Sequence, residues 1–250
     1  RRRALGHRAP PMKTAPTAAE APAPAGAPER LRALVAAQTR LRRPPLTPEF
    51  EIYSATEFEP IWSATEAELE ALGLAPPFWA FAWPGGQALA RHLLDHPASA
   101  RGRRVLAIGA GAGLEALAAA RAGAHRVVAN DIDPVAGAAA AMNAAANALS
   151  IEHCGADLFA APGAGLLEPT AADLVLLGDA LYEATAAAAF AALAQGAAAA
   201  GAEVLIGEAG RGFLPELPVE TVGRYRAPTL EALEDRAYRD VSVLRVIPPR

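Results

Sequence analysis

The sequence predicts an α/β fold in which a mostly parallel β-sheet has helices on both faces and ends in a C-terminal antiparallel hairpin. From residue 102 onward, short apolar segments typical of buried strands alternate with longer helical segments. This alternation implies parallel strands joined by right-handed crossovers. After residue 207 the alternation stops, and the stretches PVETVGRYRA and AYRDVSVLRVIP have the pattern of two consecutive strands.

The composition limits the class of protein. The chain has 250 residues, 52% of them hydrophobic and 20% charged, which is typical of a soluble globular protein with one good-sized domain. No apolar stretch reaches the roughly 18 residues of a membrane helix, so we expect no membrane contact. The single cysteine, Cys154, excludes an internal disulfide and suits a reducing compartment. We therefore expect a cytoplasmic protein, or a protein of the mitochondrial matrix if the source is eukaryotic.

Charge is unevenly distributed along the chain. Residues 1–43 carry ten Lys or Arg against two Glu, whereas the remaining 207 residues carry 13 basic against 25 acidic side chains. A body with a net charge of −12 repels the phosphate backbone, so we expect no nucleic-acid partner. The same negative charge suits a basic protein partner, and the alternative is that it serves only to keep the protein soluble.

Three regions differ in composition. Residues 1–28 are rich in Pro, Ala, Gly and Arg without apolar periodicity, which predicts a disordered tail. Residues 29–76 are predicted to form an N-terminal extension that begins with a helix over 29–43 and continues as extended chain. Residues 77–250 hold the main domain.

Five parallel strands and three helices are predicted within the main domain. They are expected at 104–108, 126–130, 151–154, 173–177 and 203–207 for the strands, and at 113–122, 134–148 and 184–199 for the helices. In this architecture the active site opens at the carboxyl ends of the parallel strands.

A glycine-rich loop follows the first of these strands, in the stretch VLAIGAGAGLEALAAARAGAHRVVANDIDP. Gly109, Gly111 and Gly113 are spaced two residues apart, whereas a dinucleotide fingerprint places its third glycine at position 114, which is leucine here. Asp131 follows at the end of the next predicted strand, where a carboxylate can bind both ribose hydroxyls of an adenosine. A nucleoside ligand, a dinucleotide and a loop that only allows a tight turn remain the alternatives.

Several blocks of the sequence resemble class I S-adenosylmethionine-dependent methyltransferases, which have a Rossmann-like, seven-stranded sheet. VLAIGAGAG, VVANDIDP and ADLVLLGDALYE carry this resemblance. With PPFWAFAWPGGQALARHLLD and VLIGEAGR, they are similar to the lysine methyltransferases of the electron transfer flavoprotein β-subunit and their bacterial relatives, over roughly residues 44–250. The resemblance implies S-adenosyl-L-methionine as cofactor and methyl transfer to a lysine of a protein substrate, with the electron transfer flavoprotein β-subunit as the suspected partner.

The resemblance implies a cofactor-binding role for the glycine loop and the acid that follows it. Gly109, Gly111 and Gly113 would let the backbone approach the methionine part of the cofactor. Asp131 would hold the ribose, and Ile132 would lie against the adenine.

Two further segments match cofactor-binding positions of the family. Asp157, at the end of the third predicted strand, matches the position that meets the adenine amino group. Trp83, Gly85 and Gly86 match a WPGG segment that closes over the cofactor. The alternatives are a core tryptophan at Trp83 and a helix or turn cap at Asp157.

One position departs from the family pattern. An acidic residue usually stands two positions before the first glycine, where it braces the loop and the amino group of the cofactor, but this position is Ala107. Its loss is worth about 1–3 kcal/mol of binding, the usual scale for a charged hydrogen bond. Glu115 and a bound water molecule are the candidates to replace it, and a degenerate chain that does not bind cofactor is the alternative.

The lysine acceptor imposes its own requirement. An ammonium has no lone pair, and reaching the amine at pH 7 from a pKa near 10.4 costs about 4.6 kcal/mol. Asp179 and Tyr182 directly follow the fourth predicted strand and match the acceptor-binding motif of related lysine methyltransferases. The resemblance therefore implies that Asp179 orients the ammonium and that Tyr182 offers a π face to it. Trp79 is a candidate second wall or a core residue, and a helix N-cap is the alternative role for Asp179.

The remaining residues favour no metal chemistry. The five histidines have no metal-ligand spacing, and we expect His92 and His96 at the surface. Three other functions stay open: a methyltransferase for a ribosomal protein or a small amine, an NAD-dependent oxidoreductase, and a non-catalytic methyltransferase-like binding module.

Overall fold

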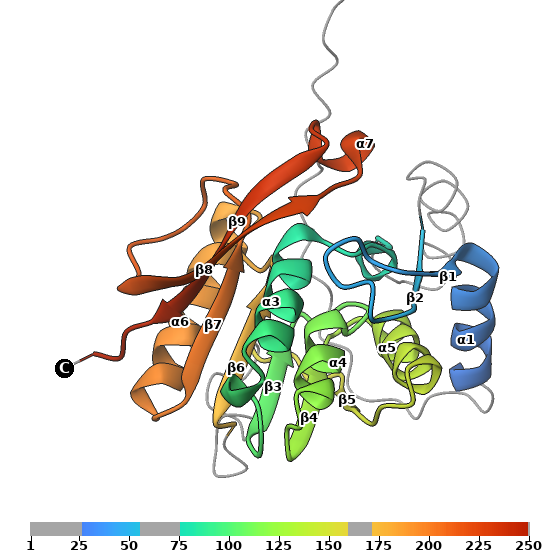
Figure 1. Ribbon diagram of the computed structural model, residues 1–250, viewed down its shortest axis with the longest axis horizontal. Coiled ribbons are helices and arrows are strands. Elements are labelled where there is room, and N and C mark those ends of the chain that lie inside the picture. The colour runs from blue at the N-terminus through green and yellow to red at the C-terminus, as the bar shows by residue number, and fades with distance from the viewer. Residues whose placement is uncertain (1–26, 56–75, 160–171, 250) are drawn as a thin grey trace, which may run out of the picture.

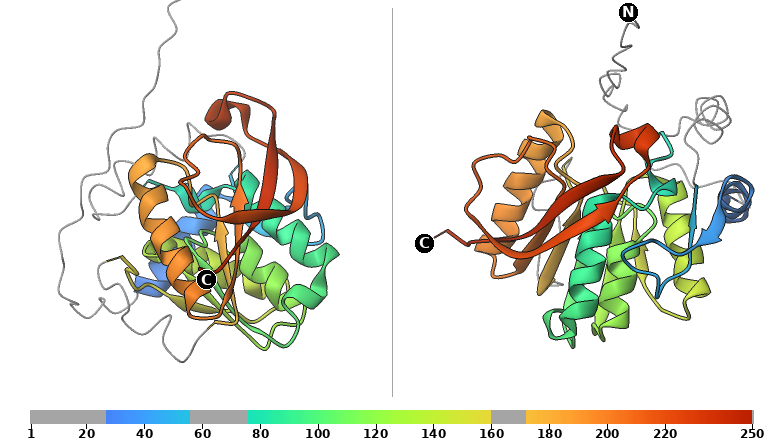
Figure 2. Two further views of the ribbon diagram at one scale, coloured as in Figure 1. Left: turned by 90° about the vertical axis from the view of Figure 1, so that its left-hand side faces the viewer. Right: turned by 45° about the horizontal axis from the view of Figure 1, so that its top comes forward.

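The computed structural model describes residues 27–55, 76–159 and 172–249. Its centre is a seven-stranded sheet with helices on both faces (Figures 1 and 2). Most of the tail predicted for residues 1–28 lies outside the described residues. Among the described helices, none has the length and apolar character that crossing a membrane requires.

The strands and helices of the main domain occur in the predicted order. The strands are β3 (Arg104–Ile108), β4 (Arg126–Asn130), β5 (Glu152–Cys154), β6 (Leu174–Gly178), β7 (Glu203–Glu208), β8 (Val219–Pro228) and β9 (Tyr238–Val246). The helices are α3 (Pro84–Asp95), α4 (Leu114–Arg121), α5 (Pro134–Ala146), α6 (Ala184–Ala199) and the short α7 (Glu231–Glu234), with 3₁₀ turns η1 (Phe78–Ala80) and η2 (Pro97–Ser99). The bounds predicted for five strands and three helices hold to within two residues, whereas α3, α7 and the two 3₁₀ turns were not predicted.

The sheet has the strand order β5-β4-β3-β6-β7-β9-β8. Strands β3 to β7 are parallel, whereas β9 pairs antiparallel with both β7 and β8, which confirms the predicted C-terminal hairpin. The chain leaves β3 toward β4 and β5 and later returns to the other side of β3 as β6. The strand order therefore reverses between β3 and β6, and this switch point is where ligands bind in open α/β sheets.

The sheet is packed on both faces. Val105 and Ala107 of β3 belong to the apolar core shared with α3 and α4, whereas Leu106 and Ile108 belong to the core beneath α6. Successive side chains of a strand point to opposite faces, so a buried parallel strand is apolar along its whole length. Figure 2 shows α6 and the α3–α4 layer on opposite sides of the sheet.

The N-terminal extension differs from its prediction. Helix α1 (Ala27–Gln38) ends well before the residue 43 that helical periodicity suggested, and β1 (Arg40–Arg42) follows it. These residues are extended because they pair antiparallel with β2 (Ile52–Ser54). The extension packs on α5, where Asn143 Oδ1 accepts a hydrogen bond from the Tyr53 amide at 2.7 Å.

The N-terminus of α3 approaches the end of β7 more closely than side chains allow. A Cβ atom on Gly207 would lie 2.9 Å from Gly85 Cα and would overlap the Gly85 carbonyl group, and a Cβ on Gly85 would overlap the Gly207 oxygen. Glycine is therefore required at both positions by contact between two backbones. This contact explains why position 85 is glycine, without any role in binding a ligand.

We expect the Gly207→Ala variant to be destabilised by about 1–3 kcal/mol, because the added methyl group must push the two backbones apart. The matched control is Gly196→Ala in α6, where a Cβ would meet nothing within 4 Å. That change should stabilise the protein by up to about 1 kcal/mol, because alanine has the higher helix propensity. Urea unfolding followed by circular dichroism measures both; equal stability of the two variants would contradict the close contact.

Candidate functional site

The glycine loop after β3 and the loop after β6 lie at the carboxyl edge of the sheet, where these two strands pair side by side. The loop after β3 and the loop after β6 face the segment that leads into α3. A pocket at this point is lined by Phe81, Trp83, Gly109, Gly111, Glu115 and Gly178, among others. The pocket therefore lies at the topological switch point.

The glycine loop has the backbone conformation that its sequence requires. Gly109, Gly111 and Gly113 have φ angles of 62°, 49° and 81°, in the left-handed region that other residues avoid. A Cβ on Gly113 would in addition lie 3.1 Å from Ala140 Cβ on α5. The glycines thus turn β3 directly into α4 and leave the loop backbone facing the pocket.

Asp131 links the end of β4 to this loop. Its Oδ2 accepts a hydrogen bond from the Gly111 amide at 2.8 Å, and its Oδ1 accepts one from the Asp133 amide at 3.0 Å. Asp133 caps α5 by accepting a hydrogen bond from the Val135 amide, and burial raises the pKa of Asp133 to about 6. A carboxylate has about four lone-pair sites, so Asp131 retains acceptor capacity for ribose hydroxyls.

Trp83, Ile132 and Asp157, which are also predicted to bind the cofactor, differ from one another in exposure and contacts. Trp83 forms a wall of the pocket, and its Nε1 donates a hydrogen bond to the Phe78 carbonyl at 2.7 Å. Ile132 is 64% exposed beside Asp131. Asp157 is exposed after β5 and accepts a hydrogen bond from the Phe159 amide at 2.9 Å. The cofactor roles of these three residues stay predictions.

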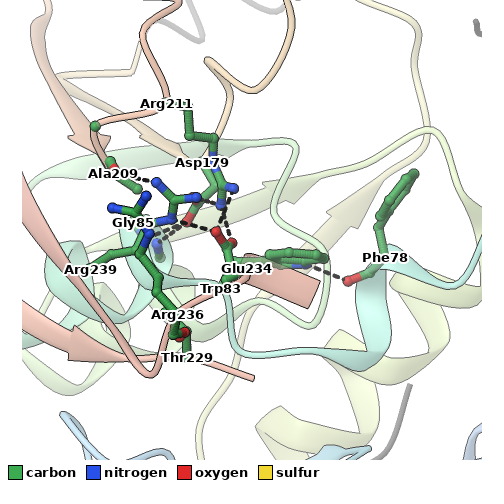
Figure 3. A network of polar contacts seen from close by, with 12 residues as sticks. Phe78, Trp83, Gly85, Asp179, Ala209, Arg211, Thr229, Glu234, Arg236 and Arg239 are labelled. Carbon is green, nitrogen blue, oxygen red and sulfur yellow. Dashed lines mark hydrogen bonds and ion pairs between the residues drawn. The ribbon is translucent and has the colours of Figure 1, made fainter. Parts of the chain in front are cut away.

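Asp179 is the centre of a buried polar network (Figure 3). Its backbone has a φ of 52°, and its side chain is only 8% exposed. Its Oδ2 accepts hydrogen bonds from the Gly85 and Gly86 amides, and its Oδ1 pairs with Arg211 Nη2 at 2.7 Å. Burial raises the pKa of Asp179, while Arg211 and the two amides oppose this rise.

Arg211 extends this network to the C-terminal hairpin. It pairs with Glu234 of α7 at 2.6 Å, and Arg239 of β9 contacts the same carboxylate. The Arg211 guanidinium also lies 5.8 Å from the centroid of the Trp83 ring. Arg211 stands in the quoted block VLIGEAGR, but only the structure shows its partners, because they come from distant parts of the chain.

The network bears on the acceptor role predicted for Asp179. Three donors already occupy its carboxylate, which leaves one of about four lone-pair sites for a lysine ammonium. Tyr182, the second predicted acceptor residue, is 41% exposed and its ring centroid lies 6.4 Å from that of Phe78. These two roles stay predictions, whereas Trp79 is 2% exposed and belongs to the core.

The histidine prediction is wrong in one case. His92 is only 5% exposed, because α3 packs against the C-terminal hairpin and places the His92 ring 3.1 Å from the Tyr225 hydroxyl. Burial lowers the pKa of His92, whereas His96 is exposed as predicted. In the part of the chain that the structure describes, no three or more His, Cys, Asp or Glu side chains gather as a metal site would require.

Comparison with known proteins defines the class. Residues 88–176 match the ribosomal protein L11 methyltransferase (PrmA) family. The crystal structure of a proposed RNA methyltransferase from Pyrococcus horikoshii shares the fold, with 15% identity and a TM-score of 0.50 over 74% of this chain and 100% of that chain. The likeness therefore defines the fold class, that of the seven-stranded S-adenosylmethionine-dependent methyltransferases.

Two relatives give the family. A Xenopus laevis protein named electron transfer flavoprotein beta subunit lysine methyltransferase is 38% identical over 189 residues, which are 75% of this chain and 74% of that protein. A Danio rerio protein of the same name is 41% identical over 167 residues, 66% of this chain and 62% of that protein. The chain belongs to this family of electron transfer flavoprotein β-subunit lysine methyltransferases. The Danio match spans less than two thirds of that relative's length.

Glu115 makes the stability of the folded protein depend on pH. Burial raises the pKa of Glu115 to about 8, and the neighbouring charges of Asp179 and Asp131 add to this rise. In the unfolded chain Glu115 ionises near its ordinary pKa of about 4.5, so the unfolded state binds fewer protons between these two values. The stability associated with Glu115 is therefore complete below pH 4.5 and is lost progressively as the pH rises to 8.

We expect the Glu115→Gln variant to avoid this loss of stability at rising pH, because glutamine does not ionise. Between pH 5 and pH 8, the free energy of unfolding of the variant should rise relative to that of the unchanged protein by about 3 kcal/mol. Asp133 titrates in the same range in both proteins, so its contribution cancels in the comparison. Urea unfolding at the two pH values measures the difference, and an identical pH dependence of the two proteins would contradict the buried carboxyl group.

Proposed function

We propose that this chain transfers a methyl group from S-adenosylmethionine to a lysine side chain of the electron transfer flavoprotein β-subunit. The observation that carries this proposal is the 38% identity to the Xenopus laevis enzyme over three quarters of the chain. The loop after β6 supports it, because Gly178 lines the pocket and is followed by a buried acid, Asp179, and a partly exposed tyrosine, Tyr182.

The pocket suits the cofactor chemically. S-adenosylmethionine supplies an electrophilic methyl group on a sulfonium, which an amine attacks as the bond to sulfur breaks. Asp131 offers carboxylate oxygens to the ribose hydroxyls, and the left-handed glycines let the ligand approach the loop backbone. Trp83 closes one side of the pocket with an aromatic wall.

The acceptor side must attract an ammonium and then release its proton. Asp179 is held in place by Arg211 and by two amides of α3, and one lone-pair site of its carboxylate remains to accept a hydrogen bond from an ammonium. Tyr182 and Phe78, whose ring centroids lie 6.4 Å apart, offer aromatic surface to the ammonium. A carboxylate that is already paired with Arg211 is a weak base, so these residues orient the lysine and its proton leaves to solvent.

The protein partner is favoured by charge. Residues 44–250 carry a net charge of −12, which complements a substrate surface that presents lysine. We expect neither nucleic acid nor membrane to take part. We further propose a reducing compartment, the cytoplasm or the mitochondrial matrix of a eukaryote, in keeping with the single cysteine.

A ribosomal protein is the second candidate acceptor, because residues 88–176 match the L11 methyltransferase family. This match includes the glycine loop and Asp131 but leaves out both the segment before α3 and the loop after β6. A small amine is a third acceptor, and a binding module without catalysis is the remaining alternative.

We expect the purified protein to methylate the β-subunit within the assembled electron transfer flavoprotein. The protein is incubated with labelled S-adenosylmethionine and either the flavoprotein or ribosomal protein L11, and the modified lysine is located by mass spectrometry. Label on a β-subunit lysine supports the proposal. Label confined to L11, or to neither protein, overturns it.

Tyr182 provides a test of the acceptor side. We expect Tyr182→Ala to lower methyl transfer tenfold or more, about 1.4 kcal/mol in the transition state, because the aromatic face for the ammonium is lost. Affinity for S-adenosylhomocysteine should change less than twofold. The matched control, Tyr182→Phe, keeps the ring and should retain most of the activity. Equal rates for the alanine and phenylalanine variants would place the acceptor elsewhere.

A further inference from the structure

Glu115 is a buried acid that the proposed reaction does not yet use. It is the second residue of α4, directly after the glycine loop, and its side chain is enclosed with only 3% of the residue exposed. Its carboxyl group lies between the end of β6 and the start of α3. A Cβ atom on Gly178 would lie 2.9 Å from Glu115 Oε1, and one on Gly86 would lie 3.4 Å from Oε2. Two glycines thus leave room for this carboxyl group.

No cation accompanies Glu115 in the described part of the chain. None of the ion pairs between described residues includes it, and Arg211 is held by Asp179 and Glu234. The charged groups that act on it are Asp179, after β6, and Asp131, after β4, and both are acidic. A buried carboxyl group among other acids costs stability unless a positive ligand neutralises it.

The carboxyl group also borders the pocket that the glycine loop forms. Glu115 lines this pocket together with Gly109, Gly111 and Trp83. A buried acid without a counter-charge at the wall of a ligand pocket is suited to a positively charged part of the ligand. Of the groups on S-adenosylmethionine, the methionyl ammonium is the one that donates hydrogen bonds and carries charge.

We propose that Glu115 binds the methionyl ammonium of the cofactor and supplies the acid that is missing at Ala107. This inference rests on the proposed function, because it takes S-adenosylmethionine as the ligand. Ala107 belongs to the core on the face of the sheet that α3 and α4 cover, and α4 carries Glu115 on this same face. An acid on α4 therefore reaches the ends of β3 and β6 from the side on which position 107 faces.

Ligand binding should change the charge of Glu115. Since burial, together with the charges of Asp179 and Asp131, raises the pKa of Glu115 to about 8, its carboxyl group is mostly protonated at pH 7. An ammonium at hydrogen-bond distance stabilises the carboxylate and lowers this pKa. Binding of a ligand that carries the ammonium therefore releases close to one proton at pH 7, whereas a ligand without it releases none.

The test compares two ligands that differ only in the amino-acid group. S-adenosylhomocysteine carries the ammonium, whereas 5′-methylthioadenosine has the same adenosine and sulfur but no amino-acid chain. Calorimetry at pH 7 measures the affinity of each, and repeating it in phosphate and in Tris, whose ionisation enthalpies differ, gives the number of protons released.

We expect Glu115→Gln to weaken S-adenosylhomocysteine binding tenfold or more and to abolish its proton release. The same variant should bind 5′-methylthioadenosine within twofold of the unchanged protein. The contrasting variant is Asp131→Asn, which should weaken both ligands alike because both contain the ribose. Circular dichroism confirms that each variant is folded.

Two outcomes overturn the inference: unchanged S-adenosylhomocysteine affinity in folded Glu115→Gln, and a parallel loss for both ligands, which would mean that Glu115 only shapes the pocket. An unchanged protein that binds neither ligand would overturn this inference together with the cofactor. An unchanged protein that shows the expected ligand pattern but leaves the flavoprotein unmethylated would overturn the proposed function and support the role of Glu115.

Discussion

The buried carboxylate of Asp179 joins segments that are far apart in the sequence. It accepts hydrogen bonds from the Gly85 and Gly86 amides, at the helix N-terminus where the dipole of α3 favours an anion. It also pairs with Arg211 on the loop after β7, which in turn holds Glu234 of the C-terminal hairpin. Because the chain just before α3 carries the aromatic wall of the pocket, the pocket and the loop after β6 share this one anchor.

Three acids meet at the carboxyl edge of the sheet, and each has a different partner. Asp131 is bound by loop amides and Asp179 by a guanidinium and two amides, whereas no cation in the described part of the chain pairs with Glu115. The same chemical group therefore serves to shape the loop, to anchor a helix or to bind charge, according to what surrounds it. A site with an excess of acid suits a reaction in which cofactor and acceptor both arrive as cations.

The matches to known proteins cover different lengths of the chain. The match to the L11 methyltransferase family covers residues 88–176, which include the glycine loop and Asp131 but end before Asp179. The electron transfer flavoprotein relatives match a longer part of the chain. The loops after β6 and β7 lie outside the L11 methyltransferase match.

The sequence by itself determined the order of strands and helices and the glycine loop, because apolar periodicity and residue spacing reflect neighbours along the chain. It did not determine the end of α1 or the burial of His92, since strand pairing and the packing of the hairpin decide these. Only the tertiary structure decided which acids have partners. Arg211 lies 32 positions from Asp179, and among the described residues no cation pairs with Glu115. A long-range ion pair leaves no local pattern, because the fold alone brings its members together.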